Sequence, residues 1–379
     1  MNDFLFSSKL VYNLPRNSFY LRSGSIGAMM NIKYDKFNLL NKLYEPNDNF
    51  FLNHQSSYYD QFKPLKDLKI LQNIPLTLET LKKVETLLRS GADLTVTCCS
   101  FLDPVEKAVQ VLQDAGVKVV IDHNSLNDDF DIVLDCSAEL RSIIKPRKGS
   151  VELTKTGVNL FRASTPFAPV IDIDSTRTKE IETVLGTGDG FIRAFLELTN
   201  LKTLEDKPIV VFGFGKVGQG IVRKIIEYKG VPTIIEADPQ RALLATMQGH
   251  KAIDASEKFK VETVVSSSYA VVTATGINEV ISQNYDEKAF IGRILANMGG
   301  GDEFGIKIPE IACLANKSPI NFAIDRPTLM KYIDPIFYLH NYCAELLAQY
   351  DFKNKVYTLN TQKDFEVSSK WEDFHKETI

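Results

Sequence analysis

Apolar residues recur along the first half of the chain in two patterns, short continuous runs and longer stretches with a helical period. Short runs of this kind are typical of buried strands, and a 3.6-residue period is typical of amphipathic helices. Strands are predicted at residues 68–74, 93–99, 117–122 and 131–136, and helices at 77–91 and 103–116. Strands that alternate with helices favour a parallel sheet with crossover helices. We therefore expect a doubly wound α/β domain here.

The second half repeats the alternation. Helices are predicted at residues 176–186, 191–201 and 333–349, and strands at 209–212, 233–235, 263–267, 269–275 and 292–298. The glycine cluster at 186–190 could cradle a phosphate, but it lies between two helical patterns with no strand before it. A hinge or helix–helix junction is the favoured interpretation. The overall fold class is then α/β, with two doubly wound, Rossmann-like domains.

Residues 208–220, PIVVFGFGKVGQG, carry the most specific motif of the chain. A buried strand leads into Gly213, Gly215 and Gly218, whose spacing is G-x-G-x-x-G, and a helical pattern follows. The first glycine permits a tight turn, the second lets a pyrophosphate approach the backbone, and the third allows close packing of helix and strand. The helix N-terminus offers N–H groups and partial positive charge to that phosphate.

Glu236 strengthens this interpretation, because it ends the next apolar strand about twenty residues after Gly213. In this position a carboxylate accepts the ribose 2′-hydroxyl and repels a 2′-phosphate. NAD is therefore expected rather than NADP. The alternative is a Rossmann domain with a purely structural role and no bound dinucleotide.

Composition and charge narrow the class of protein. The net charge of -4 shows no basic excess of the kind that nucleic-acid binding needs. The five cysteines have neither disulfide-framework nor zinc spacing, and Cys98 and Cys99 are expected to be reduced and buried. We expect no metal site. No signal peptide or apolar run long enough for a membrane span is found. A cytoplasmic protein with a small-molecule substrate fits these features.

From about Lys63 to Gln349 the sequence resembles the S-adenosylhomocysteine hydrolase family. The matching segments are KPLKDLKI, TLETLKKVETLLRSGADLTVTCC, DIVLDCSAEL, ELTKTGVNLFRA, FGFGKVGQG with IIEADPQRAL, VVTATG, ANMGGGDEFG and DPIFYLHNYCAELLAQ. The resemblance implies a two-domain subunit with tightly bound NAD, in a homo-oligomer. It also implies transient oxidation of a nucleoside 3′-hydroxyl, which is why a hydrolase would need a hydride carrier.

The resemblance implies a domain division and a cofactor shell. Residues 1–187 and 331–350 would form the substrate domain, 188–330 the inserted NAD-binding domain, and 351–379 a tail that is a surface arm or packs on a partner chain. The cofactor residues would be Gly213, Gly215, Lys216, Val217, Gly218, Glu236, Thr154, Thr156, Thr275, Gly276, Met298 and Asn321.

On the substrate side the sequence departs from the family. Thr77 and Glu79 match the residues that read adenine, but Pro75 and Gly300 replace the family's two active-site histidines. Leu153 stands at a family glutamate, and Asp334 at a later histidine and remains a substrate-binding candidate. Elimination and addition beside a ketone require groups that move protons near neutral pH. Hydrolysis by the family route is therefore not expected.

Acid–base chemistry falls on three candidates. Asp135 ends an apolar strand, where sites of α/β proteins gather. The family's lysine and aspartate fall on Glu180 and Glu182 when the alignment is counted back from Gly186, whereas counting forward from Thr178 leaves the lysine on Ile181. Glu182 and the neighbouring Lys179 are kept as candidates, although Glu180 and Glu182 could equally form a solvated helix face. His340 could replace a lost base, but packing or solvent exposure is the favoured interpretation.

The expected function is a redox or redox-assisted step with NAD on a small polar substrate. A substrate that carries an adenosine-like group is one option. Two alternatives stay open, a catalytically silent NAD sensor or scaffold and a hydrolase with rebuilt acid and base. A homo-oligomer, dimer or tetramer, is expected, with no nucleic-acid or membrane partner.

Overall fold

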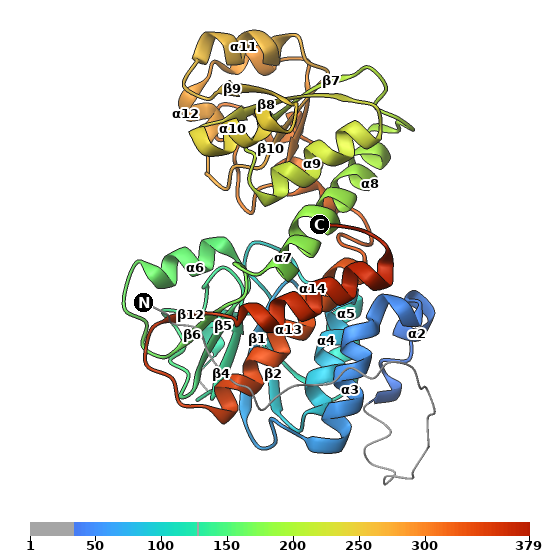
Figure 1. The fold of residues 1–379 in the computed structure, drawn as a ribbon, viewed down its shortest axis with the longest axis vertical. Helices are drawn as coiled ribbons and strands as arrows, with labels where there is room; N and C mark the ends of the chain where they lie inside the picture. The colour runs from blue at the N-terminus through green and yellow to red at the C-terminus, as the bar shows by residue number, and fades with distance from the viewer. Residues whose placement is uncertain (1–33, 127–128) are drawn as a thin grey trace. The chain divides into compact units, whose positions relative to one another are not determined.

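The computed structural model describes residues 34–126 and 129–379, which divide into two compact units (Figure 1). The first unit contains the described residues up to Lys179 and Asp334–Lys376, and the second contains Glu180–Ile333 and Glu377–Ile379. The sequence puts the divisions at 187/188 and 330/331. Residues 351–376, expected as a separate tail, belong to the first unit. Among the helices in the described part of the chain, none combines the length and apolar character that crossing a bilayer requires.

The first unit is built on a parallel sheet in the strand order β12-β6-β5-β4-β1-β2-β3. All its pairings are parallel, as the alternation of strands and helices predicts. The strands are β1 (Lys69–Asn73), β2 (Asp93–Thr97), β3 (Lys118–Val119), β4 (Ile132–Asp135), β5 (Gly149–Glu152), β6 (Val170–Asp172) and β12 (Val356–Thr358). Cys98 and Cys99 follow β2 as buried free thiols, as expected.

Helices cover this sheet, and α4 (Leu78–Arg89) shows why they form where they do. Thr77 and Thr80 make a reciprocal capping box that satisfies amides of the first turn. The helix packs against α3 (Phe50–Phe62), the longest element that the structure describes between residues 34 and 63. The other helices with residues in this unit are α2 (Leu40–Leu43), α5 (Glu106–Asp114), α6 (Lys155–Arg162), α7 (Arg177–Glu180), α13 (Met330–Gln349) and α14 (Thr361–His375), with the short η1 (Pro46–Asn49) and η2 (His123–Ser125).

The C-terminal segment is an integral part of the first unit. Strand β12 pairs with β6, so it forms the edge of the sheet. In α14 the carboxylate of Asp364 accepts hydrogen bonds from the amides of Arg177 (2.7 Å) and Thr178 (2.9 Å), and from the Thr178 hydroxyl (2.7 Å). Trp371 of the same helix is completely buried. A surface arm would show none of these contacts.

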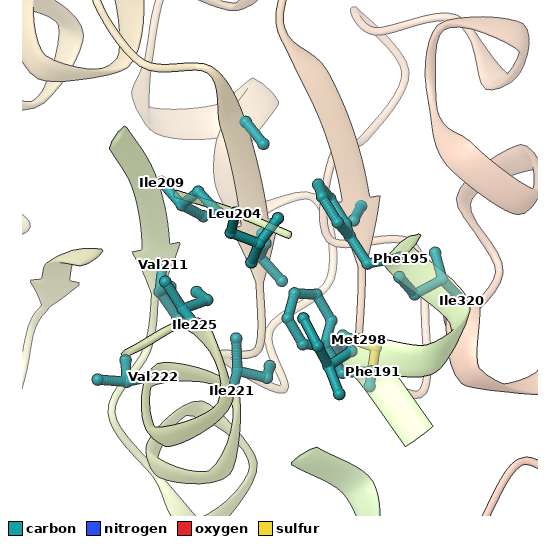
Figure 2. Close-up of a cluster of buried hydrophobic side chains, with 14 of the residues drawn as sticks. Phe191, Phe195, Leu204, Ile209, Val211, Ile221, Val222, Ile225, Met298 and Ile320 are labelled. Carbon is teal, nitrogen blue, oxygen red and sulfur yellow. The ribbon is translucent and has the colours of Figure 1, made fainter. Parts of the chain in front are cut away.

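The second unit is a five-stranded sheet in the order β11-β10-β7-β8-β9, again with parallel pairings. Its strands are β7 (Pro208–Phe212), β8 (Val231–Glu236), β9 (Lys251–Asp254), β10 (Ala270–Thr273) and β11 (Ile294–Asn297). Its helices are α8 (Thr187–Thr199), α9 (Lys216–Glu227), α10 (Pro239–Met247), α11 (Lys258–Ser266) and α12 (Val280–Asn284), with the short η4 (Glu287–Phe290), η5 (Glu310–Ala312), η6 (Leu314–Lys317) and η7 (Ile320–Ala323). Figure 2 shows the apolar core that α8 and α9 bury against this sheet.

One predicted strand of this unit is wrong. Residues 263–267 lie at the end of helix α11 and in the residue after it, where Val261 and Val265 are buried one helical turn apart. The run Val264–Val265 has the β-branched composition of a strand, so periodicity over so few residues did not decide between the two states. Strand β9 was not predicted.

The glycine cluster at 186–190 is helical and is neither a loop nor a phosphate cradle. It joins a π-helical segment, η3 (Ile181–Gly186), to α8. A β-carbon on Gly188 would lie 2.7 Å from the carbonyl oxygen of Gly220, and one on Gly190 would lie 2.1 Å from that of Pro327. These glycines are therefore needed for close packing of α8 against α9 and the segment before α13.

Candidate functional site

The turn between β7 and α9 has the geometry that its glycines predict. Gly213 has a left-handed φ of +93°, and a β-carbon there would lie 2.5 Å from the carbonyl oxygen of Ala274. A β-carbon on Gly218 would lie 2.1 Å from the carbonyl oxygen of Gly213. A β-carbon on Gly215 would meet no atom within 4 Å. The first and third glycines therefore serve the turn itself, and the second faces open space that a diphosphate can fill.

Helix α9 begins directly after this open position. Gly215 is its N-cap, with extended backbone and no side-chain cap, so Lys216 and Val217 form the first turn. The first amides of a helix lack intrahelical acceptors and carry partial positive charge. Together with the open face of Gly215, this turn fits the diphosphate of a dinucleotide.

Glu236 lies at the carboxyl end of β8 and is 6 % exposed. One carboxylate oxygen accepts the amide of Phe214 at 2.6 Å, and the other accepts those of Ala237 and Asp238 at 2.8 and 2.9 Å. A carboxylate has about four acceptor sites, so about one remains for a ribose hydroxyl. Glu236 therefore ties the glycine turn to β8 and can still bind a nucleoside.

The Glu236→Ala variant should lose NAD affinity by at least about tenfold, since both the hydroxyl acceptor and the tie to Phe214 disappear. Its preference for NAD over NADP should fall by more, because the charge that repels a 2′-phosphate is gone. Dissociation constants for the two dinucleotides measure this. Asp238→Ala is the matched control. Asp238 lies two residues after Glu236 and carries the same charge, but its carboxylate caps helix α10. Equal losses in the two variants would contradict the assignment.

Of the other predicted cofactor residues of this unit, two are hydrogen-bonded to a buried carboxylate and two are themselves buried. The amides of Thr275 and Gly276 already donate to the buried carboxylate of Glu303, which sequence reasoning missed. Met298 is 6 % exposed and packs in the apolar core, where Figure 2 shows it next to Phe191. The side chain of Met298 is therefore not available to a cofactor. Asn321 is buried in η7.

Asp135 ends β4 in the first unit and is 1 % exposed. Its oxygens accept hydrogen bonds from the Asn73 amide (2.9 Å) and from the backbone N–H groups of Cys136 (2.8 Å) and Leu140 (3.2 Å). Burial, and then the charge of Glu152, raise the pKa of this carboxyl well above its usual range. Asp135 also lines a cavity of about 150 Å³.

Glu152 is a second buried carboxyl, paired in register with Asp135 across β4 and β5, and sequence reasoning missed it. It accepts from the amides of Ser137, Ala138 and Thr154, and from the Thr154 hydroxyl at 2.7 Å. Ser137 and Ala138 have positive φ, so Glu152 holds a left-handed turn in place. The sequence signal that could have revealed Glu152 is its position at the end of a strand, the same position that Asp135 has in the preceding strand.

Thr154 and Thr156, expected at the cofactor, have different surroundings. Thr154 is the N-cap of α6, and its hydroxyl accepts from Gly157 (3.2 Å) and donates to Glu152. Thr156 is exposed in the first turn of that helix. The Thr154 hydroxyl therefore has a structural use.

Thr77 and Glu79, the adenine-reading candidates, lie together at the start of α4. Glu79 is 2 % exposed and accepts from the Thr77 hydroxyl (2.8 Å) and the Tyr44 hydroxyl (3.1 Å). Tyr44 was not predicted, because it lies in a segment with weak periodicity.

Asp334, the other substrate candidate, is a helix cap. Its two oxygens accept the amides of Phe51 (2.7 Å) and Leu52 (2.9 Å) in the first turn of α3. Burial raises the pKa of this carboxyl to about 7. These contacts give Asp334 a structural role at the start of α3, and the side chain is only 2 % exposed.

Lys179 and Glu182 belong to different units. Lys179 is 4 % exposed and is the last residue of the first unit before the chain passes into the second. Glu182 is half-buried in the π-helical segment η3 of the second unit. His340 is completely buried, with Nε2 3.2 Å from the carbonyl oxygen of Val151. This agrees with packing rather than a role as a base.

Lys83 is a buried amine that the helical pattern did not reveal. It is 0 % exposed, its Nζ donates to Gln72 Oε1 at 2.6 Å, and burial lowers its pKa well below the usual value. The charge of Lys83 also contributes, after burial, to the lowered pKa of His340.

This lysine should make the first unit more stable as the pH rises. Between the lowered folded pKa and the ordinary value of about 10.4, the unfolded chain binds a proton that the native chain lacks, so stability increases by about 1.4 kcal/mol per pH unit. As the pH rises toward the ordinary lysine pKa, the free energy of unfolding should therefore increase relative to that of Lys83→Met. Urea denaturation followed by the fluorescence of the single tryptophan, Trp371, reports on this unit. Parallel pH profiles of the two proteins would refute the assignment.

Comparisons with known proteins add the following. A protein-family model described as "S-adenosyl-L-homocysteine hydrolase, NAD binding domain" matches residues 189–332. The adenosylhomocysteinase of Thermococcus kodakarensis is 28 % identical over 306 residues, which cover 74 % of this chain and 70 % of that protein. The S-inosyl-L-homocysteine hydrolase of Methanopyrus kandleri is 26 % identical over 269 residues, covering 64 % and 62 %. A dipicolinate synthase chain from Bacillus halodurans has a TM-score of 0.46 at 14 % identity, over 76 % of this protein and 99 % of that one.

Proposed function

Because this chain belongs to the S-adenosyl-L-homocysteine hydrolase family and has its NAD-binding domain, we propose that it catalyses an NAD-dependent redox or redox-assisted step on a small polar substrate. The observation that supports this is the complete glycine turn with Glu236, together with Pro75 and Gly300 at the positions of the family's histidines. The dinucleotide turn is present while two of the family's proton carriers are replaced, and this combination supports oxidation without the family's hydrolysis as the proposed function.

The chemistry needed is simple. Oxidation of a carbinol removes a hydride from carbon and a proton from oxygen, and bound NAD supplies the hydride acceptor. A side chain must take the proton. Asp135 and Lys179 in the first unit and Glu182 in the second are the candidates. The raised pKa of Asp135 brings this carboxyl closer to the range in which a group exchanges protons near neutral pH.

The test is a stopped-flow measurement of NADH absorbance with a panel of nucleosides, hydroxy acids and amines. Adenosine and inosine belong in the panel, since the two relatives are named for adenosyl- and inosyl-homocysteine chemistry. NADH formation with one class of substrate supports the proposal. Homocysteine release from adenosylhomocysteine that vanishes in Asp135→Asn would instead support a rebuilt hydrolase.

A silent NAD sensor is the second candidate, and the hydrogen bonding of the carboxyls favours it. Asp135 has three donors and Asp334 has two, so both already serve the fold. Bound NAD with no absorbance change across the whole panel would support the sensor. We further propose that the protein is cytoplasmic and forms a homo-oligomer, a dimer or tetramer. Light scattering tests the number of subunits.

A further inference from the structure

The loop after β10 forms one wall of the glycine turn. A β-carbon on Gly213 would lie 2.5 Å from the carbonyl oxygen of Ala274 and 3.2 Å from the α-carbon of Thr275. The two loops are therefore in direct contact at the carboxyl edge of neighbouring strands, since β7 pairs with β10. The strand order also reverses between β7 and β10, where the two mononucleotide halves of a Rossmann site meet.

Glu303 fixes this wall from inside the protein. It is 0 % exposed, and one oxygen accepts the Gly276 amide at 2.6 Å. The other oxygen accepts the Thr275 amide at 2.9 Å and the Thr275 hydroxyl at 2.8 Å. These donors, which point into the protein toward Glu303, are consequently not available to a cofactor. The loop can contribute to the site only through its position.

Gly299 and Asn297 keep Glu303 in place. A β-carbon on Gly299 would collide with Oε1 of Glu303, so only glycine fits beside the carboxylate. The Asn297 side chain accepts from the Gly299 amide (3.1 Å) and donates to the carbonyl oxygens of Gly301 (2.7 Å) and Lys317 (2.6 Å). The segment that leads from β11 to Glu303 is therefore fixed at both sides of Gly300.

We propose that Glu303 is a positioning residue of the NAD site, which acts on the mononucleotide half beside β10 and not on the adenosine half beside β8. Glu236 serves the adenosine half, and Glu303 holds the wall of the other half. This inference rests on NAD binding, which the proposed function also requires. It does not depend on which substrate is oxidised, or on whether any is.

The test compares NAD with ADP, which contains only the adenosine half and the diphosphate. Glu303→Gln keeps the shape but turns an NH₂ group toward the amide of Thr275 or Gly276, so the wall loses its fixed position. The dissociation constant for NAD should rise at least tenfold, and that for ADP less than threefold. Asp364→Asn is the matched control, because Asp364 also accepts two amides and one threonine hydroxyl, but in the first unit. It should leave both constants unchanged.

Two results would overturn the inference: an unchanged NAD constant in Glu303→Gln, or equal losses for NAD and ADP. If this variant does not fold, Thr275→Val removes only the hydroxyl that donates to Glu303. It should also weaken the binding of NAD more than that of ADP, by a smaller factor. Wild-type protein that binds NAD but forms no NADH would reject the proposed redox function and leave the role of Glu303 standing. Wild-type protein that does not bind NAD would reject both.

Discussion

Replacing Gly218 with alanine should abolish tight NAD binding, with an affinity loss of at least about a hundredfold, or about 2.7 kcal/mol. The added methyl group would lie 2.1 Å from the carbonyl oxygen of Gly213, which is backbone and cannot rotate away. The turn must then move by about an ångström, and the amides of the first turn of α9 move with it. Overpacking of this kind also costs about 1–3 kcal/mol of stability. Titration with NAD and thermal unfolding of the apoprotein measure the two effects.

Gly215→Ala separates these effects. A methyl group at Gly215 meets no protein atom within 4 Å, and the residue has extended backbone that alanine adopts. The apoprotein should therefore melt at nearly the wild-type temperature. NAD affinity should still fall by at least about tenfold, since the methyl group fills the space of the pyrophosphate. Wild-type affinity in Gly215→Ala would mean that the diphosphate does not lie on this turn.

The nucleotide half of the site was predictable because its signals are local. The β7–α9–β8 unit follows from an apolar run, three glycines at fixed spacing and a carboxylate at the end of the next strand. Each of these requirements acts within about 25 residues of sequence. The structure adds what spacing cannot supply, namely that Glu236 binds the Phe214 amide and so joins the two ends of the motif.

The rest depended on contacts between distant segments. Lys83 is one of two adjacent lysines on α4, and it is buried against Gln72 of β1. Asp334 stands where the family has a histidine, but it caps α3 from more than 280 residues away along the chain. Helical period and family position carry no information on such packing partners. The packing partners of the substrate-side candidates could therefore not be predicted from the sequence.

The C-terminal segment gives the largest expected effect on stability. Its polar, mixed-charge sequence predicts a tail. The prediction fails because a few apolar residues are enough to anchor one helix. Trp371 is completely buried in α14, whereas Phe365 of the same helix is 61 % exposed. Two aromatic residues six positions apart on one helix thus face opposite environments, and they form a matched pair for mutation.

Trp371→Ala should lower the free energy of unfolding by about 3–5 kcal/mol, the range for large buried aromatic residues replaced by alanine. Phe365→Ala should stay within about 0.5 kcal/mol of wild type. Urea denaturation followed by circular dichroism suits both variants, since the first removes the only tryptophan. If α14 were a mobile surface arm, the two substitutions would be equally mild. A selective loss in Trp371→Ala would mean that the first unit needs residues beyond 350 to complete its core, because the sheet edge β12 and the Asp364 cap of α7 depend on the same segment.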